Sequence, residues 1–194
     1  MARFDKAREE NFGPITSRLY SLLSGIFLES SIYKFAADDI LRSKARKILD
    51  IGTGPATIPI KVASQSDRVE IYAIDPSKDM LRIASKKAKD SGIHFAEGHS
   101  LHVPFHTKFD LITSSISFHH WAHKKESLEY LSQFLNRDGE IRIYEFRKIG
   151  HLPIQAKHSM TKEELRGAAE GTGLRVKEII EKKNKLRASY VKNR

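Results

Sequence analysis

Short runs of apolar residues alternate along the chain with apolar residues at helical spacing, which is the pattern of an α/β fold. The clearest case is the segment RKILDIGTGPATIPIKVA at residues 46–63. Residues 48–51 form a run typical of a buried strand, the GTGP motif at residues 52–55 breaks it, and residues 56–63 suit a helix. We expect Pro55 at the first helical position, because the amide hydrogen that proline lacks has no partner there.

The same alternation continues and predicts a largely parallel sheet, because strands separated by helices pair in parallel. Further strands are expected at residues 69–74, 93–96, 109–115, 140–146, 175–180 and 186–191, and further helices at residues 77–91, 124–135 and 161–171. Ser77 is the expected N-cap of the first of these helices, and Thr161 with Glu164 predicts a capping box on the last. Residues 136–139 are interpreted as a turn and residues 147–160 as irregular.

The first 44 residues precede this pattern and carry two stretches of helical spacing, at residues 15–27 and 32–41. We therefore expect one domain over residues 1–194, in which a helical cap (1–44) precedes an α/β core (45–194). A chain of 194 residues is long enough for one hydrophobic core and too short for two.

Composition excludes several classes of protein. The chain has no cysteine, so it forms neither disulfides nor thiolate zinc sites. No apolar run reaches the ~18 residues of a membrane span, and the N-terminal segment MARFDKAREE lacks the apolar centre of a signal peptide. With 40% hydrophobic residues, the chain is typical of a globular protein, and we expect it in the cytoplasm.

The net charge of +10 is concentrated near the C-terminus, where basic residues outnumber acidic ones over residues 175–194. Such a cluster can bind nucleic acid or anionic lipid. Alternatively, it is a solvated hairpin whose lysines keep the edge of the sheet from pairing with another chain. The hairpin is favoured, because no aromatic platform for stacking bases is interleaved with the charges. Neutralising Lys182, Lys183 and Lys185 should then leave the fold intact.

Two carboxylates, Asp50 and Asp75, end the first two predicted strands. An acid after the second strand of an open α/β sheet is suited to bind ribose hydroxyls. The glycines of the GTGP motif let the backbone approach a ligand closely, beside a helix N-terminus. Thr57 stands where the GxGxxG fingerprint of dinucleotide-binding proteins has its third glycine, which argues against a nicotinamide cofactor.

The segments DIGTGPA, AIDPSKDML and FDLI resemble the motifs of class I S-adenosylmethionine-dependent methyltransferases, most of all the small single-domain type that includes the quinone-biosynthesis enzymes. The resemblance covers residues 44–146 and, more loosely, the C-terminus. It implies a Rossmann-like, doubly wound, seven-stranded and mostly parallel sheet, with helices on both faces and N-terminal capping helices. It also implies S-adenosylmethionine as the cofactor, with its methionyl part at the glycine turn and its ribose at Asp75. The cofactor-binding residues expected on this basis are Asp50, Gly52, Thr53, Gly54, Asp75, Pro76, Met80, Gly98, His99 and Ser114.

His99 departs from the family pattern, in which an acid at this position accepts a hydrogen bond from the adenine amino group. A neutral imidazole can accept such a hydrogen bond, whereas a protonated imidazole cannot. Glu97 is an alternative acceptor.

His119 and His120 follow the fourth predicted strand, at the sheet edge where open α/β folds form their sites. Imidazole can take a proton from a methyl acceptor near neutral pH. His120, at a position where the family often has histidine, is the stronger candidate base. The alternative is a structural role for the two histidines beside Trp121, which we expect to be a packing anchor. By analogy with the family, Phe12, Tyr20 and Tyr33 of the cap would wall the acceptor pocket.

Two other interpretations concern side chains in the same part of the chain. A metal site is the less favoured interpretation, because the candidate ligands are loosely spaced. These candidates are His99, His102, His106, His119, His120 and His123. Asp110 is expected to anchor backbone rather than take part in chemistry.

The sequence thus favours a methyltransferase that acts on a small-molecule acceptor. An RNA methyltransferase is the first alternative, although the fourth strand lacks the Asn/Asp-Pro-Pro-aromatic motif of base amino methylation. The second alternative is a cofactor-binding protein without catalysis, or a nicotinamide oxidoreductase.

Overall fold

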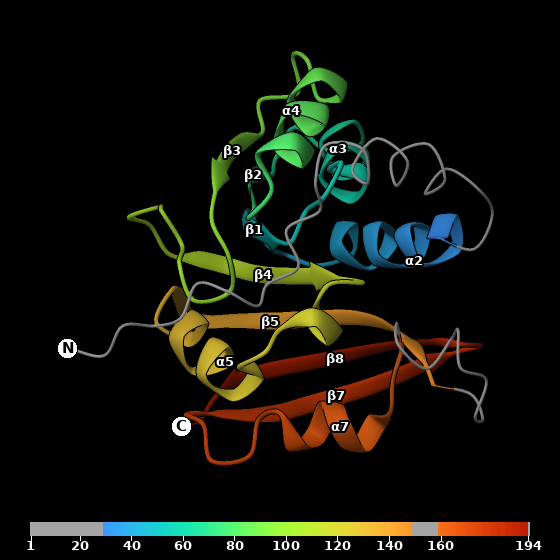
Figure 1. Cartoon of the computed structure of the whole chain (residues 1–194), viewed down its shortest axis with the longest axis vertical. Coiled ribbons are helices and arrows are strands. Elements are labelled where there is room, and N and C mark those ends of the chain that lie inside the picture. Colours follow the sequence, from blue (N-terminus) through green and yellow to red (C-terminus); the bar gives the residue numbers. More distant parts are fainter. Residues whose placement is uncertain (1–28, 149–158, 194) are drawn as a thin grey trace.

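The structure, a computed structural model, describes residues 29–148 and 159–193 (Figure 1). Its helices are α2 (Glu29–Leu41), α3 (Thr57–Ala63), α4 (Lys78–Lys87), the 3-10 turn η1 (Phe118–His120), α5 (Lys124–Ser132) and α7 (Lys162–Gly167). Its strands are β1 (Lys47–Ile51), β2 (Glu70–Asp75), β3 (His94–Glu97), β4 (Phe109–Ser115), β5 (Leu135–Arg147), β6 (Ser159–Met160), β7 (Leu174–Lys182) and β8 (Lys185–Lys192).

One sheet runs through the described residues in the strand order β3-β2-β1-β4-β5-β8-β7. Neighbours among β1 to β5 are parallel, whereas β8 lies antiparallel between β5 and β7. The order reverses between β1 and β4, which is the point where open α/β sheets bind their ligands. The expected Rossmann-like sheet of seven mostly parallel strands is confirmed.

The short strand β6 is an addition to the expected sheet. It pairs in parallel with the end of β5, Ser159 opposite Phe146 and Met160 opposite Arg147. We interpreted this part of the chain as irregular, because a strand of two residues is too short to show an alternating pattern.

Helices cover both faces of the sheet, as the resemblance implied (Figure 1). On one face, α2 and α3 pack on β1, β2 and β4 through a cluster of buried residues that includes Ile32, Ala36, Ile58, Val62, Ile71 and Leu111. On the other face, α5 and α7 pack on β4, β5 and β8 through Leu128, Leu131, Leu165, Ile112, Ile141 and Ala188. Of the two predicted cap helices, the second corresponds to α2, and residues 15–27 lie outside the described residues.

The expected helix ends are confirmed where side chains cap them. Ser77 Oγ accepts a hydrogen bond from Met80 N at the start of α4. At the start of α7, Thr161 and Glu164 form the reciprocal capping box. Such caps satisfy amide groups that have no partner within the helix.

Two turn predictions were wrong. Pro55 is not helical, because Gly54 and Ala56 on either side of it both have positive φ, so that α3 begins only at Thr57. The predicted turn at residues 136–139 belongs to β5 instead. There the pairing of β5 with β4 shifts register, and a Cβ atom at Gly139 would lie 2.8 Å from Phe109 O. The glycine therefore serves a close backbone approach in an irregular part of the sheet.

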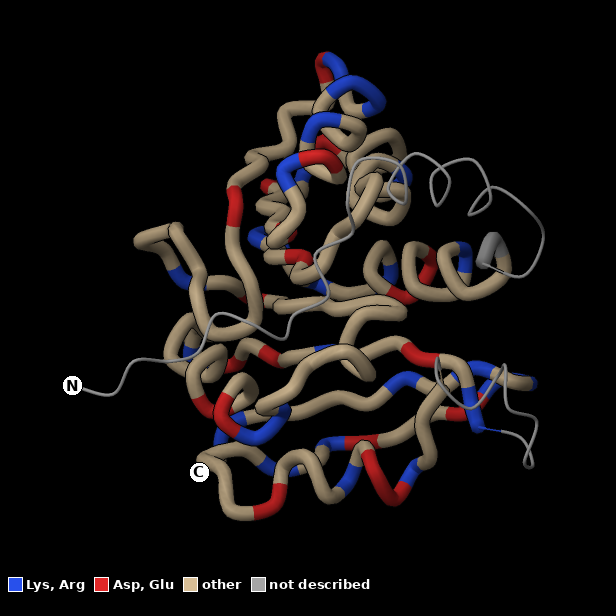
Figure 2. Tube along the Cα trace, viewed as in Figure 1, with Lys and Arg blue, Asp and Glu red and all other residues tan. Residues whose placement is uncertain are grey.

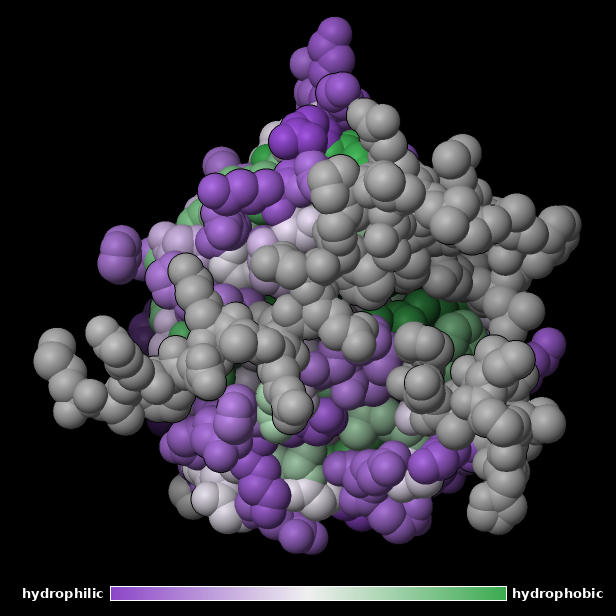
Figure 3. All heavy atoms as spheres, viewed as in Figure 1, coloured by the Kyte–Doolittle hydropathy of each residue, from purple (hydrophilic) through white to green (hydrophobic). Residues whose placement is uncertain are grey.

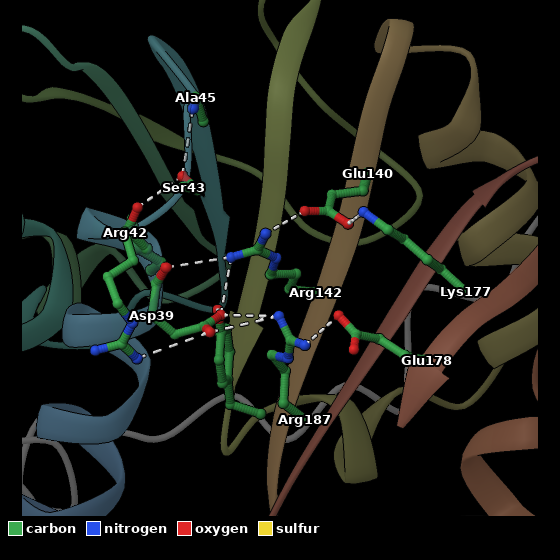
Figure 4. Close-up of polar contacts among 11 residues, drawn as sticks. Asp39, Arg42, Ser43, Ala45, Glu140, Arg142, Lys177, Glu178 and Arg187 are labelled. Atoms are coloured by element: carbon green, nitrogen blue, oxygen red, sulfur yellow. Dashed lines mark hydrogen bonds and ion pairs between the residues drawn. The ribbon is translucent and has the colours of Figure 1, made fainter. Parts of the chain in front are cut away.

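The interpretation of the C-terminal basic cluster as a solvated edge was only partly right. Lys182 and Lys183 are exposed, but β8 is an interior strand, on which Lys185 is 8% and Arg187 4% exposed. Lys185 Nζ donates to Ser31 Oγ at 3.3 Å, and Arg187 pairs with acids of α2 and β7 (Figure 4). Figure 2 shows Lys and Arg interspersed with Asp and Glu along this half of the chain. Neutralising Lys185 is therefore not equivalent to removing a solvated charge.

Candidate cofactor and active site

The turn between β1 and α3 has a backbone that favours glycine. φ is 69° at Gly52, 53° at Gly54 and 56° at Ala56. A Cβ atom at Gly52 would lie 2.1 Å from Ser117 Oγ, whereas one at Gly54 would meet no atom within 4 Å. Gly52 thus lets the loop after β4 approach β1, and Gly54 leaves open space beside the turn.

Asp75 connects the end of β2 to both neighbouring loops. Its Oδ2 accepts a hydrogen bond from Gly54 N at 2.8 Å, and its Oδ1 accepts one from Ser77 N at 2.9 Å. Each carboxylate oxygen has a second lone pair. The carboxylate can therefore hold the glycine turn in place and still accept hydrogen bonds from the two hydroxyls of a ribose.

Asp50 is a buried carboxyl group at the end of β1. Thr113 of β4 donates a hydrogen bond from its hydroxyl to Asp50 Oδ1 at 2.7 Å. Burial raises the pKa of Asp50 to about 6, with the nearby Asp75 carboxylate acting in the same direction and the Thr113 hydroxyl opposing it. Because burial disfavours the negative charge of the Asp50 carboxylate, a cationic ligand bound beside it would stabilise that charge.

A narrow cavity lies over this turn, walled by β4 and α2. It is lined by Asp50, Gly52, Thr53, Gly54, Pro55, Thr57, Ile58, Tyr33, Ser115 and Ile116, and it measures 40 Å³. The described residues thus leave space for one end of a nucleoside-sized ligand and not for all of it. Tyr33, expected in the acceptor pocket, lies here, while Phe12 and Tyr20 lie outside the described residues.

Hydroxyl groups at this point suit a polar ligand. The Thr53 hydroxyl lies beside the Asp50 carboxyl and, like that of Thr113, opposes the rise of its pKa. Ser115 Oγ is buried without a hydrogen-bond partner in the described part of the chain. Buried polar atoms are normally paired, so Ser115 Oγ marks a place where a ligand group fits. The residues present therefore fit the amino acid end of S-adenosylmethionine.

The structure places Ser115, rather than the predicted Ser114, in the cavity lining. Side chains alternate along β4, so that Ser115 shares the face of Thr113, whose hydroxyl reaches Asp50. This shared face of Thr113 and Ser115 is the sequence signal that could have identified Ser115. Ser114 Oγ is buried and also lacks a partner among the described residues, and its role stays a prediction.

Ile116, directly after β4, has a φ of 52°. This is a conformation that β-branched residues rarely adopt, and such strain is concentrated at functional sites. The backbone is held there by a hydrogen bond from Ile116 N to Tyr144 O at 2.9 Å. Nothing in the sequence indicates this feature.

The loop after β3 is tightly closed around Gly98 and His99. A Cβ atom at Gly98 would lie 2.7 Å from His102 O, so this glycine serves the packing of the loop. His99 Nδ1 accepts a hydrogen bond from Leu101 N at 3.3 Å. In the neutral ring the proton then sits on Nε2, which makes that atom a donor. Toward adenine, the ring would donate to a ring nitrogen rather than accept from the amino group.

The other predicted cofactor residues lie near the start of α4. Met80 is buried in the packing of that helix, and Pro76 is half-buried. Glu97, the alternative adenine acceptor, is exposed and forms an ion pair with Lys78 at 3.4 Å. The contacts of all three with a cofactor stay predictions.

Of the two predicted catalytic histidines, His119 is held by an acid that sequence reasoning missed. Glu145 of β5 accepts a hydrogen bond from His119 N at 3.1 Å, and its other oxygen lies 2.9 Å from His119 Nδ1. The His120 ring contacts that of His119 at an interplanar angle of 45°, with centroids 4.0 Å apart. Alternation along β5 could have identified Glu145, because it shares the buried face of Ile141 and Ile143.

The segment that carries these histidines is anchored on both sides. Trp121 is buried, packs on Phe118, and donates from Nε1 to Ser117 Oγ at 3.4 Å, in keeping with its expected role. Lys124 Nζ donates to the carbonyl oxygens of His119 and Trp121. Burial lowers the pKa of Lys124, although nearby carboxylates partly offset it.

Within residues 29–148 and 159–193, no group of three or more His, Cys, Asp or Glu side chains is arranged to hold a metal ion. Over the same residues, no helix has the length and apolarity needed to span a membrane.

Comparisons with known proteins agree with this geometry. A family model described as "Methyltransferase domain" matches residues 42–189. An uncharacterized methyltransferase of Alkaliphilus oremlandii is 36% identical over 108 residues, which cover 55% of this chain and 48% of that protein. A demethylmenaquinone methyltransferase of Deinococcus radiodurans is 29% identical over 147 residues, which cover 73% of this chain and 61% of that protein. The chain thus spans less than two thirds of the length of these relatives.

The fold also matches a solved structure along almost its whole length. A crystal structure of an S-adenosylmethionine-dependent methyltransferase from Aquifex aeolicus superposes with a TM-score of 0.75 at 18% identity. The match covers 93% of this chain and 98% of that one. At this identity the likeness concerns the fold alone.

Proposed function

The chain belongs to the class I S-adenosylmethionine-dependent methyltransferase family, and from this premise we propose that it transfers a methyl group from S-adenosylmethionine to a small molecule. The observation that supports this most is the meeting of three features at the point where the sheet order reverses. These are the open space beside Gly54, the carboxylate of Asp75 and the unpartnered hydroxyl of Ser115. Together they offer contacts for both the ribose and the amino acid end of the cofactor.

Each group of the chain has a distinct task in this proposal. Asp75 binds the ribose hydroxyls, while Thr53 and Ser115 bind the amino acid end through their hydroxyls. Asp50 supplies a buried negative charge that favours a cationic ligand. When bound, the cofactor would supply a methyl group on a positively charged sulfur, and this sulfur is the leaving group when the acceptor takes the methyl group. The chain contributes alignment and the exclusion of water.

The acceptor is proposed to be a small molecule because relatives with a named substrate are demethylmenaquinone methyltransferases. His119 and His120 are the proposed proton acceptors, since both follow β4 at the edge of the sheet where the cofactor would lie. Labelled methyl transfer to a metabolite extract, compared with transfer to RNA, separates this proposal from the RNA alternative.

The test of the cofactor site is calorimetry with S-adenosylhomocysteine, with NAD and ATP as comparison ligands. We expect binding of the sulfur ligand and little heat from the other two. Gly54→Ala should weaken binding by at least 10-fold, because the new methyl group enters the space beside the turn. Gly171→Ala is the matched control, since Gly171 also has positive φ and open space around it but lies after α7. Binding of NAD without binding of S-adenosylhomocysteine contradicts the proposal.

A further inference from the structure

The pairing of Glu145 with His119 has a geometry that suits proton transfer. We propose that Glu145 is a positioning residue that holds His119 as the proton acceptor of the reaction, so that the substrate is a molecule whose attacked O–H, N–H or acidic C–H loses its proton. This inference rests on the proposed methyl transfer and adds to it the class of the acceptor. It also assigns the base to His119 rather than to His120.

Glu145 is an unusual residue for its place in the fold. It is 0% exposed, and it lies on the face of β5 that also carries Ile141 and Ile143, opposite Leu186 of β8. A carboxylate is rarely placed among apolar side chains unless it is paired. Both of its oxygens contact His119, one through the backbone amide and one through the ring.

This pairing determines which ring nitrogen of His119 can accept a proton. An ionised carboxylate can only accept a hydrogen bond, so the proposal makes Nδ1 the donor to Glu145 and puts the lone pair of the neutral ring on Nε2. The ring orientation is fixed at the same time, since the side chain is only 5% exposed. Lys124 holds the carbonyl oxygen of His119 at 3.3 Å, so the backbone of this residue is fixed on both sides.

The same segment lies between the cofactor turn and a second cavity. Ser117, two residues before His119, reaches Gly52 so closely that a Cβ atom there would collide with it. His119 itself lines a cavity of 460 Å³ between η1, α5, β6 and α7, whose wall also carries the charged side chains of Lys124, Lys125, Lys148 and Glu164 beside Met160 and Ala168. Figure 3 shows weakly apolar surface flanked by hydrophilic residues over this part of the molecule. The space is large enough for a small acceptor and offers it both apolar and charged contacts.

The proton step follows from these contacts. The proton of the attacked O–H, N–H or acidic C–H would pass to His119 Nε2, and the electron pair left on the acceptor atom would form the bond to the methyl carbon. The bond from that carbon to the sulfur of the cofactor would break, and the sulfur would leave as a neutral thioether. The resulting imidazolium keeps its Nδ1–H bond to the Glu145 carboxylate, which compensates the positive charge. The proton then leaves Nε2 to solvent, and the pair returns to its first state.

The first test is the tautomer of His119, measured by NMR of protein labelled with nitrogen-15 in histidine. His119→Asn assigns the signal. We expect Nδ1 to be protonated and Nε2 to be unprotonated in the parent. In Glu145→Gln the proton should move to Nε2, because a glutamine amide has one acceptor oxygen and cannot accept from both His119 N and Nδ1. An Nε2–H tautomer in the parent overturns the proposal.

The second test measures how fast the ring of His119 reacts as a nucleophile. Glu145 would not increase this rate if the pair had only a structural role. Methyl 4-nitrobenzenesulfonate transfers its methyl group to a nucleophilic imidazole nitrogen, and mass spectrometry of peptides locates the product. We expect methylation of His119 in the parent and a rate at least 10-fold lower in Glu145→Gln. His123→Asn, which changes an exposed histidine four residues away, should react at the rate of the parent.

Equal rates in the parent and in Glu145→Gln, or methylation of His120 in place of His119, overturn the proposal. If Glu145→Gln does not fold, the tautomer and the methylated residue in the parent decide the question alone. Neither test involves the cofactor. Failure of S-adenosylhomocysteine to bind would therefore refute the proposed function, whereas the tautomer and the reactivity of His119 would still show whether Glu145 positions it.

Discussion

At the scale of single residues, the carboxyl group of Asp50 makes the stability of the ligand-free protein depend on pH. Its pKa in the folded state, about 6, lies above the ordinary value of 3.8 for an aspartate side chain. Between these values the folded protein binds more protons than the unfolded chain, so stability falls as the pH rises. Above pH 6 this loss of folding stability is complete. It amounts to about 3 kcal/mol, at 1.36 kcal/mol for each pKa unit.

Asp50→Asn is therefore expected to stabilise the ligand-free protein at pH 7 by up to about 3 kcal/mol, and to weaken binding of S-adenosylmethionine. The gain should shrink toward pH 4, where the parent carboxyl is protonated. Urea unfolding at pH 4, 5.5 and 7 measures this, with the exposed Asp67→Asn as a control for charge removal. A difference between Asp50→Asn and the parent that does not change with pH would show that burial of this charge has no net cost.

The predicted site residues that the structure brings together are those whose place follows from the local chain. Asp75 ends a predicted strand and Gly54 lies in the turn after one, and any open α/β sheet brings such positions together. Ser115 and Glu145 were missed, because their importance depends on which face of a strand meets a residue far away in the chain. The positive φ of Ile116 could not be predicted, because isoleucine rarely adopts this backbone conformation.

At the scale of elements, Asp110 ties the starts of three strands together. Its Oδ2 accepts hydrogen bonds from the backbone amides of Arg46 and Lys47, at 2.9 and 3.0 Å, where β1 begins. Its Oδ1 accepts one from the side chain of Asn136 in β5. Burial raises the pKa of Asp110, but these hydrogen bonds outweigh it and leave the pKa below its usual value. The anchoring role expected from the sequence is thus what these contacts provide.

We expect Asp110→Ala to destabilise the protein by about 1–3 kcal/mol, because it leaves two backbone amides without their acceptor. Asn136→Ala removes only one of the three hydrogen bonds and should cost less. The contribution of Asp110 is lost as the pH falls through its lowered pKa, so the variant and the parent should converge in strong acid. Equal stability of Asp110→Ala and the parent at pH 7, by urea unfolding, would mean that water replaces the carboxylate without loss.

The elements that could be predicted are those with a regular apolar pattern or a side-chain cap. β1, β2, β4 and α4 follow from periodicity, and the start of α7 follows from Thr161 and Glu164. The turn at residues 136–139 was mistaken, because Gly139 signals a close approach to β4 that only the folded sheet contains. Likewise, Pro55 suits a helix start by itself, but the positive φ of both neighbours prevents it.

At the scale of the whole molecule, a network of charges joins α2 to the sheet. Asp39 Oδ2 accepts hydrogen bonds from Arg142 Nη1 and Tyr144 OH, each at 2.8 Å, and from Arg187 Nη1 at 3.3 Å (Figure 4). Glu140 pairs with Arg142, and Glu178 pairs with Arg187. The side chain of Asp39 is 15% exposed, and burial raises the pKa of Tyr144 beside it. This network therefore lies largely out of water.

Asp39→Asn is expected to destabilise the protein by about 3 kcal/mol, because removing one partner of a buried ion pair leaves the other charge without compensation. The neighbouring Asp38 gives a matched control, since it pairs with Lys34 in an exposed contact along the helix. Asp38→Asn should cost about 0.5 kcal/mol or less. Similar urea midpoints for the two variants would refute a special role for the network.

The network should also influence the cofactor site, because α2 carries Tyr33 into the cavity beside Gly54. Asp39→Asn is then expected to weaken S-adenosylhomocysteine binding several-fold under conditions where the protein stays folded, whereas Asp38→Asn leaves it unchanged. Replacing the buried polar groups together, as Asp39→Leu, Glu140→Leu, Arg142→Met, Tyr144→Phe and Arg187→Met, separates the two effects, because no buried member of the network then loses its partner. Stability should return, since apolar side chains can replace a buried ion pair without loss. If binding returns as well, the cofactor site requires only that α2 be docked, and if it does not, the site requires the alignment that the charges impose.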